Sequence, residues 1–220
     1  EYYFFTNNSS KSQQAYIEKL DKLGIPIQKE QMMISSHVII KYLKDHYDGK
    51  SIYVVGTPSL IQEFQYFDMN LVEEDPDIVV LGFDTTLTYE KLEKACHYIR
   101  NGCVYFGINP DWNCPMEGGK FIPDCGSMAK LIEASTGKFP DFFGKPSKYT
   151  LNYIIQETGY QPEEIAIVGD RLYTDIAVAD QSDVTSILVL SGESTRKDVE
   201  ASDVKPDVIL EDLSEITKML

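Results

Sequence analysis

Long hydrophobic runs and paired cysteine motifs are missing from this chain of 220 residues. No apolar stretch approaches the ~20 residues that a membrane-spanning helix needs, and no signal-peptide pattern is recognised at the start. The four cysteines, Cys96, Cys103, Cys114 and Cys125, include no C-x-x-C pair. This spacing favours free thiols over a zinc site. Because thiols stay reduced in the cytoplasm, we expect a cytoplasmic protein.

Positive charge is also scarce. The chain has 20 lysines and arginines but 35 aspartates and glutamates, which gives a formal net charge of -15. Such a surface repels the backbone of a nucleic acid and an anionic membrane, so neither is expected as a partner. A small phosphate ligand remains compatible with this charge, because a local lysine and a metal ion can reverse the sign of the potential inside one cleft.

Strand-like and helix-like patterns alternate along most of the chain. Short apolar runs predict strands, and apolar residues at three- and four-residue spacing predict helices. Strands are predicted at 2–5, 51–56, 78–82, 103–107, 165–168, 186–190 and 208–210, and helices at 13–23, 36–47, 59–67, 89–100, 126–136, 149–158 and 213–220. The alternation predicts an α/β fold with a mostly parallel sheet.

Residues 165–175 place two carboxylates beside a predicted strand. Residues 165–168 predict a strand buried on both faces, Gly169 ends it, and Asp170 and Asp175 follow. Ligands of open α/β sheets bind at the carboxyl ends of the strands. Two carboxylates there would repel each other without a cation, and Mg²⁺ takes carboxylate and phosphate oxygens as ligands. The alternative is that Asp170 caps a helix and Asp175 is a solvated acid in its first turn.

Two further segments carry groups that suit a phosphate. Thr6-Asn7-Asn8-Ser9-Ser10 follows the first predicted strand and offers hydroxyls, amides and backbone N–H donors. Such a cluster can cradle a phosphate, or it can form a turn and a helix cap. Lys145 stands in a Gly144-Lys145-Pro146 turn before a predicted helix. A lysine in that place suits a phosphate as a point charge, although most lysines are merely solvated.

The segment 111–124 is predicted to be a long loop, since it is rich in Gly, Pro and Asn. Long loops inside α/β units are usually functional or disordered. The loop contains Trp112, the only tryptophan of the chain. Trp112 can contact a ligand, but a tryptophan that plugs the edge of a core is the commoner case.

The order of these segments resembles the haloacid dehalogenase-like hydrolases. It is similar in particular to the NagD/4-nitrophenylphosphatase branch, in which a cap domain lies between the Thr motif and the Lys motif. The resemblance rests on Thr6-Asn7-Asn8, on Gly144-Lys145-Pro146, and on Val168-Gly169-Asp170-Arg171 followed by Asp175. Cap-like stretches occur at 79–84, 88–92, 109–111 and 126–127, and 187–192 resembles the strand that follows the acidic motif.

The resemblance implies a Rossmann-like parallel-sheet core domain and an inserted α/β cap domain. The core would comprise residues 1–27 and 141–220, and the cap residues 28–140. The cap would close over the site, exclude water and select the substrate. Asn109, Asp111 and Trp112 are the cap residues that we expect to face the substrate.

The resemblance also implies a Mg²⁺-dependent phosphatase, in which an aspartate attacks phosphorus and water hydrolyses the aspartyl-phosphate. Thr6 and Asn7 would bind phosphate oxygens, and Lys145 would neutralise the phosphate and the nucleophile. Asp170 would ligate Mg²⁺ directly, and Asp175 would do so through water or as an anchor behind the ligands.

One part of the family pattern is missing. The nucleophile motif D-x-D-G-T/S, which the family carries on the first core strand, does not occur in this sequence. We expect it upstream of residue 1, so that residues 1–220 by themselves would be inactive and poorly folded. Without that strand, the strands of the Thr motif and the acidic motif would lack a shared partner. The family also tends to have glycine where Ala179 and Asp183 stand, and often at Asp124.

Two other functions remain open. A non-catalytic relative that binds phosphate and docks a partner fits the missing motif. A receiver-like domain fits less well, because Lys145 precedes the acidic pair. The expected ligand is a small phosphorylated metabolite, and relatives hydrolyse sugar phosphates, nucleotides, phosphoglycolate and pyridoxal phosphate. A homodimer is a further expectation, since caps of this branch often help to form dimers.

Overall fold

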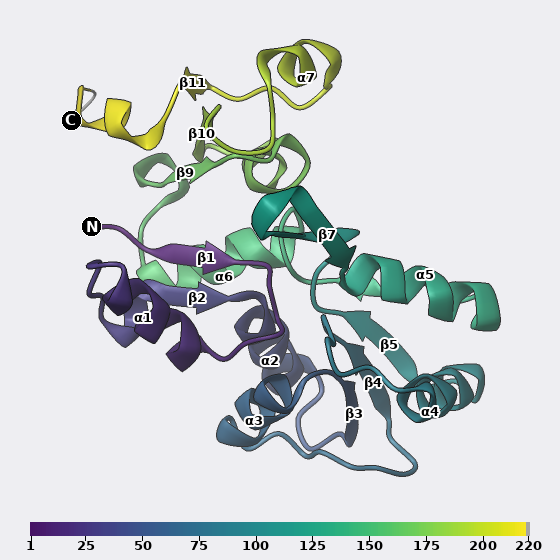
Figure 1. Ribbon diagram of the computed structural model, residues 1–220. Helices are drawn as coiled ribbons and strands as arrows, with labels where there is room; N and C mark the ends of the chain where they lie inside the picture. The colour runs from purple at the N-terminus through teal and green to yellow at the C-terminus, as the bar shows by residue number, and fades with distance from the viewer. Residues whose placement is uncertain (219–220) are drawn as a thin grey trace. The chain divides into compact units, whose positions relative to one another are not determined.

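The computed structural model describes residues 1–218, and the chain divides into two compact units, Glu1–Gly144 and Lys145–Leu220 (Figure 1). Residues 1–27 and 28–140 share the first unit, so the assignment of 1–27 and 141–220 to one core domain stays a prediction. The helix predicted at 213–220 is a 3-10 helix over Leu213–Lys218, and residues 219 and 220 lie outside the described part. Within that part, no helix has the length and apolarity needed to cross a membrane.

The first unit contains a four-stranded parallel sheet in the order β3-β4-β5-β8. Its strands are β3 (Ile52–Val55), β4 (Ile78–Leu81), β5 (Val104–Gly107) and β8 (Asp141–Phe142). Parallel strands need crossover connections, which contain the helices α3 (Pro58–Tyr66), α4 (Tyr89–Arg100) and α5 (Cys125–Thr136) (Figure 1). Every residue of β3 and β4 is buried, which explains their continuous apolar sequences.

Both faces of this sheet are covered, because alternate residues of a strand point to opposite sides. One core joins the sheet to α4 and α5 and includes Tyr53, Val55, Val79, Leu81, Tyr105, Ala95, Ile99, Met128 and Ile132. On the other face, Phe106 contacts Tyr42 of α2 (Ser35–His46). Leu60 of α3 lies against Gly56 and Gly82 at the ends of β3 and β4. The predicted α/β layering is therefore confirmed.

The N-terminal strand β1 (Phe4–Thr6) pairs in parallel with β2 (Met32–Ile34), and α1 (Gln13–Lys22) lies between them in the chain. Ser12 caps α1, since its hydroxyl accepts from the backbone N–H of Ala15. The sequence did not predict β2, because three apolar residues are too few to show a period. The pair β1–β2 places the loop after Thr6 at the carboxyl end of a parallel pair.

The prediction of a loop over 111–124 is wrong for most of that segment. β6 (Asn113–Met116) and β7 (Lys120–Pro123) form an antiparallel hairpin. Gly118 and Gly119 both have positive φ values in its turn, a conformation that glycine adopts without strain. The Gly-Gly pair was thus a hairpin signal, and the Pro and Asn content of the segment obscured it.

The second unit contains a three-stranded parallel sheet in the order β11-β10-β9 (Figure 1). Its strands are β9 (Ala166–Gly169), β10 (Thr185–Val189) and β11 (Val208–Leu210). The helix α6 (Lys148–Thr158) precedes β9, and α7 (Arg196–Ala201) connects β10 to β11. Leu172, Ile176 and Leu188 form a small core, against which Leu190, Val199 and Val204 pack.

Two predictions for residues 165–175 need correction. β9 is half-buried rather than buried on both faces, and within residues 1–218 it pairs only with β10, which leaves one edge of the strand open. The segment after Asp170 is π-helical over Leu172–Ile176 rather than the start of an α-helix. The carbonyl of Arg171 accepts from the N–H groups of both Asp175 and Ile176, which gives the wider turn.

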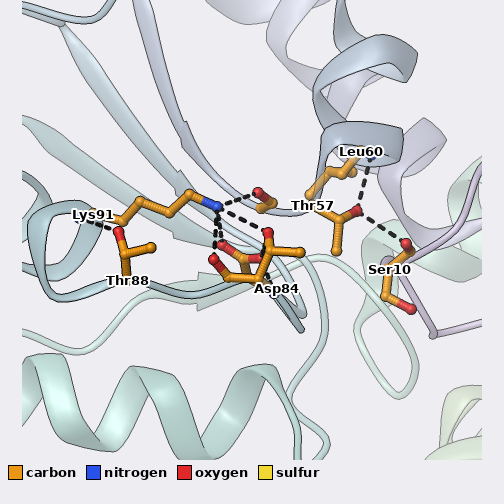
Figure 2. Close-up of polar contacts among 8 residues, drawn as sticks. Ser10, Thr57, Leu60, Asp84, Thr88 and Lys91 are labelled. Carbon is orange, nitrogen blue, oxygen red and sulfur yellow. Dashed lines mark hydrogen bonds and ion pairs between the residues drawn. The ribbon is translucent and has the colours of Figure 1, made fainter.

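A buried ion pair joins the ends of β3 and β4 (Figure 2). The Asp84 side chain is fully buried, and Lys91 donates to its Oδ2 at 2.6 Å and to the carbonyl oxygen of Gly56 at 2.9 Å. Thr86 donates to the other carboxylate oxygen through its N–H and its hydroxyl. Lys91 therefore compensates a carboxylate that no water reaches and connects two strand ends.

We predict that Lys91→Met destabilises the protein by about 3 kcal/mol, since removing one partner of a buried pair leaves the other charge uncompensated. The matched control is Lys94→Met, which should hardly change the stability. Within residues 1–218, Lys94 pairs only with the exposed Glu73 and Glu90. Urea unfolding at pH 7 measures both variants. Equal midpoints for the two variants would show that the Asp84–Lys91 pair does not stabilise the first unit.

A second buried carboxylate connects three helices. Glu63 of α3 accepts from the backbone N–H of Gln13 at the start of α1 (2.7 Å) and lies 3.3 Å from His37 Nε2 of α2. Burial by itself would raise the pKa of the Glu63 carboxyl. The hydrogen bonds from His37 and Gln13 outweigh burial and hold this pKa below its ordinary value.

A lowered pKa in the folded state means that the ionised Glu63 stabilises the fold above its unfolded pKa of about 4.3 and loses this effect as the pH falls through the lower folded value. We predict that Glu63→Gln costs about 1–3 kcal/mol of unfolding free energy at pH 5, and that the difference from wild type shrinks by pH 3. Urea unfolding at the two pH values measures this. A difference that stays constant or grows on acidification would contradict the assignment.

Candidate active site

An ion pair between two of the predicted site residues lies in the second unit. Lys145 Nζ donates to Asp175 Oδ1 at 2.5 Å, and both side chains are largely buried, at 13% and 11% exposed. The backbone N–H of Arg171 donates to the other oxygen, Asp175 Oδ2, at 3.1 Å. Asp175 thus uses both oxygens to hold the lysine and the turn after β9. The alternative prediction of a solvated Asp175 is wrong, because the π-helical turn buries its side chain.

Glycine at position 169 admits the Asp175 carboxyl group. A Cβ atom built on Gly169 would overlap the Cβ and the carboxylate of Asp175. The same turn is anchored from the other side, because Leu172 and Ile176 belong to the small core of this unit. The position of the Lys145–Asp175 pair therefore follows from a missing side chain on β9 and from apolar packing of the turn.

Asp170 lies at the carboxyl end of β9, facing the turn after β10. The backbone N–H of Glu193 donates to Asp170 Oδ2 at 2.9 Å, and the N–H of Ser194 donates to the Asp170 carbonyl at 3.0 Å. A Cβ on Gly192 would overlap the Asp170 carboxylate. The alternative interpretation, in which Asp170 caps a helix, does not hold. The Asp170 carboxylate accepts from the backbone N–H of Glu193, in the turn after β10.

The residues around Asp170 fit a hard divalent cation. Its Oδ1 has no hydrogen-bond partner among residues 1–218, so one carboxylate oxygen is available as a ligand. The described residues contain no group of three or more His, Cys, Asp or Glu side chains arranged to hold a metal ion. Mg²⁺ suits such a donor set, because it keeps several waters and binds through one or two carboxylates plus substrate oxygens.

The loop after β1 is held by hydrogen bonds within the first unit. Ser9 is fully buried, and its hydroxyl accepts from the N–H of Phe83 at 2.9 Å and donates to Asn109 Oδ1 at 3.2 Å. Thr57, the N-cap of α3, donates to the carbonyl of Ser10 at 2.9 Å (Figure 2). The loop is thereby fastened to the carboxyl ends of β3, β4 and β5.

Thr6 and Asn7 begin this loop. Thr6 Oγ1 accepts from the N–H of Asn8 at 3.2 Å, as in a turn that starts with a hydroxyl side chain. The carbonyl of Asn7 accepts from Ser35 at the start of α2. A Cβ on Gly144 would lie 2.7 Å from Asn7 Oδ1, so the glycine that precedes Lys145 lets this amide approach. Both interpretations of the loop, a turn and a phosphate cradle, fit this backbone.

Asn109 connects two buried carboxylates. Its Nδ2 donates to Asp111 Oδ2 at 3.2 Å and to Asp124 Oδ1 at 2.9 Å. Asp124 also caps α5, since Oδ1 accepts from the N–H of Cys125. Asp124 stands where the resemblance suggested glycine, and it forms the centre of a polar cluster at the carboxyl end of β5. The Asn109 side chain is completely buried and the Asp111 side chain is 5% exposed.

Trp112 does not plug a core, which corrects the commoner interpretation of a lone tryptophan. Its side chain is 49% exposed at the base of the β6–β7 hairpin. Its carbonyl accepts from the Asp124 N–H and from Ser127 Oγ, and these bonds fix the backbone while the indole remains accessible. An accessible indole is compatible with the predicted contact to a substrate.

Tyr16 of α1 lies beside the predicted phosphate loop and was not predicted. Its hydroxyl donates to the carbonyl of Asn8 at 3.4 Å. Burial raises the pKa of this phenol to about 12. The hydroxyl is thus protonated at neutral pH, and its proton is directed to the Asn8 carbonyl. Tyr16 follows Thr6 by ten residues, and no local pattern in the sequence links the two.

The predicted residues thus fall into two groups. Thr6, Asn7, Asn109 and Asp111 gather at the carboxyl ends of the strands in the first unit, with Trp112 on the hairpin beside them. Lys145, Asp170 and Asp175 gather at the carboxyl end of β9 in the second unit. A polar cavity of that unit, lined by Asp180, Asp183 and Asp207 at the amino end of β10, contains none of these residues.

Sequence reasoning placed Gly169 and Gly192 at strand ends but did not predict their close contact with Asp175 and Asp170, or the bond from Glu193. Gly169 and Gly192 act through the absence of a side chain, and Glu193 acts partly through its backbone N–H. A close approach at a glycine and a bond from a backbone N–H leave no pattern in a single sequence.

Comparison with known proteins shows that the chain is similar to phosphatases. Residues 1–70 match the family model of haloacid dehalogenase-like hydrolases, and residues 142–216 match a related model, described as HAD-hydrolase-like. The acid sugar phosphatase of Staphylococcus saprophyticus is 31% identical over 99% of this chain and 84% of its own length. The glycerol-3-phosphate phosphatase of Mus musculus is 33% identical over 90% of this chain and 71% of its own.

A solved structure gives the same result. The 4-nitrophenylphosphatase of Thermotoga maritima superposes with a TM-score of 0.93 and 41% identity, and the match covers 98% of this chain and 83% of the other.

We predict that Gly192→Ala displaces the Asp170 carboxylate and costs about 1–3 kcal/mol, because an added methyl group in a filled space forces a backbone shift. Ser191→Ala is the matched control, since Ser191 is an exposed neighbour in the same turn. Denaturant midpoints measure both variants. A Gly192→Ala protein with wild-type stability would mean that the turn yields easily around Asp170.

Proposed function

Because the chain belongs to the haloacid dehalogenase-like hydrolases, and to the phosphatases among them, we propose that it hydrolyses a small organic phosphate ester with the help of Mg²⁺. In the sequence, the resemblance to this family rests on three short motifs. The match to the curated relatives extends over nearly the whole chain, so the family assignment no longer depends on those motifs alone.

The observation that supports the chemistry best is the group at the end of β9. One lysine is paired with Asp175, and one carboxylate oxygen of Asp170 is left for a cation. A lysine and a divalent cation are the charges needed to balance a phosphoryl group in transfer. In a chain with a formal net charge of -15, a divalent cation bound beside Lys145 would supply the local positive charge that an anionic substrate needs.

Each residue has a proposed role. Asp170 holds the cation through Oδ1, and Asp175 orients Lys145 rather than binding the cation directly. Lys145 neutralises charge on the phosphoryl group. The family pattern assigns the binding of phosphate oxygens to the Thr6 hydroxyl and to N–H groups at Asn7. When bound, Mg²⁺ supplies charge neutralisation and orients the phosphoryl oxygens.

The nucleophile is proposed to be an aspartate on a segment other than residues 1–220. No D-x-D-G-T/S motif occurs in this sequence. Within residues 1–218, β1 pairs only with β2 and β9 only with β10, so each strand has one edge that can accept a further strand. Attack of that aspartate on phosphorus would release the alcohol and form an acyl phosphate, and water would then cleave this bond to release phosphate.

The relatives suggest the kind of substrate. Those reported above are named for acid sugar phosphates and for glycerol 3-phosphate, and both kinds of ester carry hydroxyl groups next to the phosphate. The accessible Trp112 offers an apolar surface of the sort that binds the carbon skeleton of such an alcohol, and the buried polar cluster around Asn109 fixes the backbone beside it. We infer that the sheet β3-β4-β5-β8 with its helices acts as the cap that selects this part of the substrate.

We predict that the full-length protein hydrolyses 4-nitrophenyl phosphate, and at least one of glycerol 3-phosphate and a hexose phosphate, only when Mg²⁺ is present. Asp170→Asn and Lys145→Met should each lower kcat by about 10²–10³-fold, the range for removing one charge that stabilises the transition state. The matched controls are Asp180→Asn and Lys148→Met, because both side chains are exposed.

Two outcomes would contradict the proposal. Undiminished hydrolysis by Asp170→Asn would remove the metal assignment. A folded full-length protein that hydrolyses none of the esters would favour the non-catalytic phosphate-binding alternative. Borohydride reduction during turnover, followed by peptide mapping, locates the aspartyl-phosphate, and a label inside residues 1–220 would refute the proposed position of the nucleophile.

A further inference from the structure

The turn after β10 carries an acidic side chain close to Asp170. Glu193 belongs to this turn, and its side chain is 40% exposed. A glutamate beside an aspartate in a strongly acidic protein should be repelled and remain mobile in solvent. Glu193 instead makes two side-chain contacts at once, which shows that this part of the turn is constrained.

The two contacts come from the π-helical turn after β9. Arg171 Nε lies 2.7 Å from Glu193 Oε2, and the Tyr173 hydroxyl donates to Oε1 at 2.8 Å. Each carboxylate oxygen therefore has its own donor, one charged and one neutral. A carboxylate fixed at both oxygens has a defined orientation, unlike most single surface ion pairs.

The backbone of the same residue reaches Asp170. The Glu193 N–H donates to Asp170 Oδ2 at 2.9 Å, and Gly192 has no side chain that would block this approach. The position of the N–H depends on where the turn lies, and the Glu193 side chain ties the turn to Arg171 and Tyr173. Oδ2 is thereby held, and Oδ1 is the oxygen that remains for a cation.

We propose that Glu193, clamped by Arg171 and Tyr173, is a positioning residue that sets the affinity of Asp170 for Mg²⁺. This inference rests on the proposed function, since it takes Asp170 as a Mg²⁺ ligand. Residues behind a metal ligand orient it and typically change metal affinity or activity 10–100-fold when they are removed. Glu193 reaches Asp170 through its main chain, so the carboxylate of Glu193 acts at a distance from the metal.

The rest of the turn has independent support, which separates positioning from folding. The Ser194 N–H donates to the Asp170 carbonyl, and Ser194 Oγ accepts from the N–H of Leu172 at 3.2 Å. Ser194 is buried, whereas Glu193 is exposed to a considerable degree. Loss of the Glu193 side chain should therefore loosen the N–H that binds Oδ2 while the fold of the unit persists.

The test measures Mg²⁺ binding by the full-length protein without substrate, by isothermal titration calorimetry and by the Mg²⁺-dependent rise of the thermal midpoint. Glu193→Ala should weaken Mg²⁺ binding by about tenfold, the lower end of the range for such residues, with little change in the midpoint without metal. Tyr173→Phe removes one of the two donors and should weaken binding by about threefold. Glu200→Ala on α7 is the matched control, since Glu200 is exposed and far along the chain from Asp170.

A double variant separates the clamp from unrelated effects. If Tyr173 acts through Glu193, then adding Tyr173→Phe to Glu193→Ala should cause no further loss of affinity. In turnover assays, the Mg²⁺ concentration for half-maximal rate should rise in the single variants, while kcat at saturating Mg²⁺ stays close to wild type. If Glu193 were needed only for folding, the effects of the two substitutions would not depend on each other. The half-maximal Mg²⁺ concentration would then not rise while kcat stays unchanged. Glu193→Gln keeps the size of the side chain and provides a second variant if Glu193→Ala fails to fold.

Three outcomes are decisive. Mg²⁺ affinity of Glu193→Ala within about twofold of wild type, together with loss of binding in Asp170→Asn, would overturn the inference and leave the proposed function standing. Unchanged binding in Asp170→Asn would overturn both. Glu193-dependent Mg²⁺ binding in a protein that hydrolyses no phosphate ester would support the inference and overturn the function.

Discussion

Carboxylates that gather at the ends of parallel strands repel one another, and the arrangement around β9 exists because each of them is compensated. Asp175 binds Lys145 and the N–H of Arg171, and Asp170 binds the N–H of Glu193. One carboxylate oxygen, Asp170 Oδ1, has no hydrogen-bond partner among residues 1–218. In a chain of net charge -15, a small divalent cation bound at this oxygen, as proposed above, would lower the electrostatic free energy.

Close approach of backbone to side chain makes this compensation possible. Gly169 lies against Asp175, Gly192 against Asp170 and Gly144 against Asn7, and a Cβ atom at each position would collide with the group that it faces. The absence of a side chain at each of the three glycines leaves room for the polar side chain that it faces. Glycine gives the unfolded chain more conformational freedom, so folding loses more entropy at these positions. The apolar packing of Leu172 and Ile176 helps to offset that loss.

The polar groups of the first unit follow the same logic through hydrogen bonds rather than ion pairs. Ser9 binds the ends of β4 and β5, and Thr57 binds the loop from the end of β3. Buried carboxylates at Asp84 and Glu63 each have a cationic or backbone donor. A loop fixed at several points would lose little further entropy on binding a ligand, which supports the proposed role of Thr6 and Asn7 in phosphate binding.

The amino-acid sequence by itself determined the alternation of strands and helices, and it placed the Thr6, Lys145 and Asp170 motifs at strand or turn ends. Apolar period and strand-end polarity are local properties, which is why β3, β4, β10, β11 and the major helices were predicted within a few residues. The three-residue β2 was missed because it is too short to show a period, and the hairpin at 113–123 because its Pro and Asn content resembles a loop. The π-helical turn was missed because the sequence pattern does not distinguish it from the start of an α-helix. Likewise, only the tertiary structure decided that Asp175 pairs with Lys145, that Asp124 shares Asn109 with Asp111, and that Glu193 reaches Asp170. These contacts join residues up to 30 positions apart, and no local pattern records which side chains the folded backbone brings within hydrogen-bonding distance.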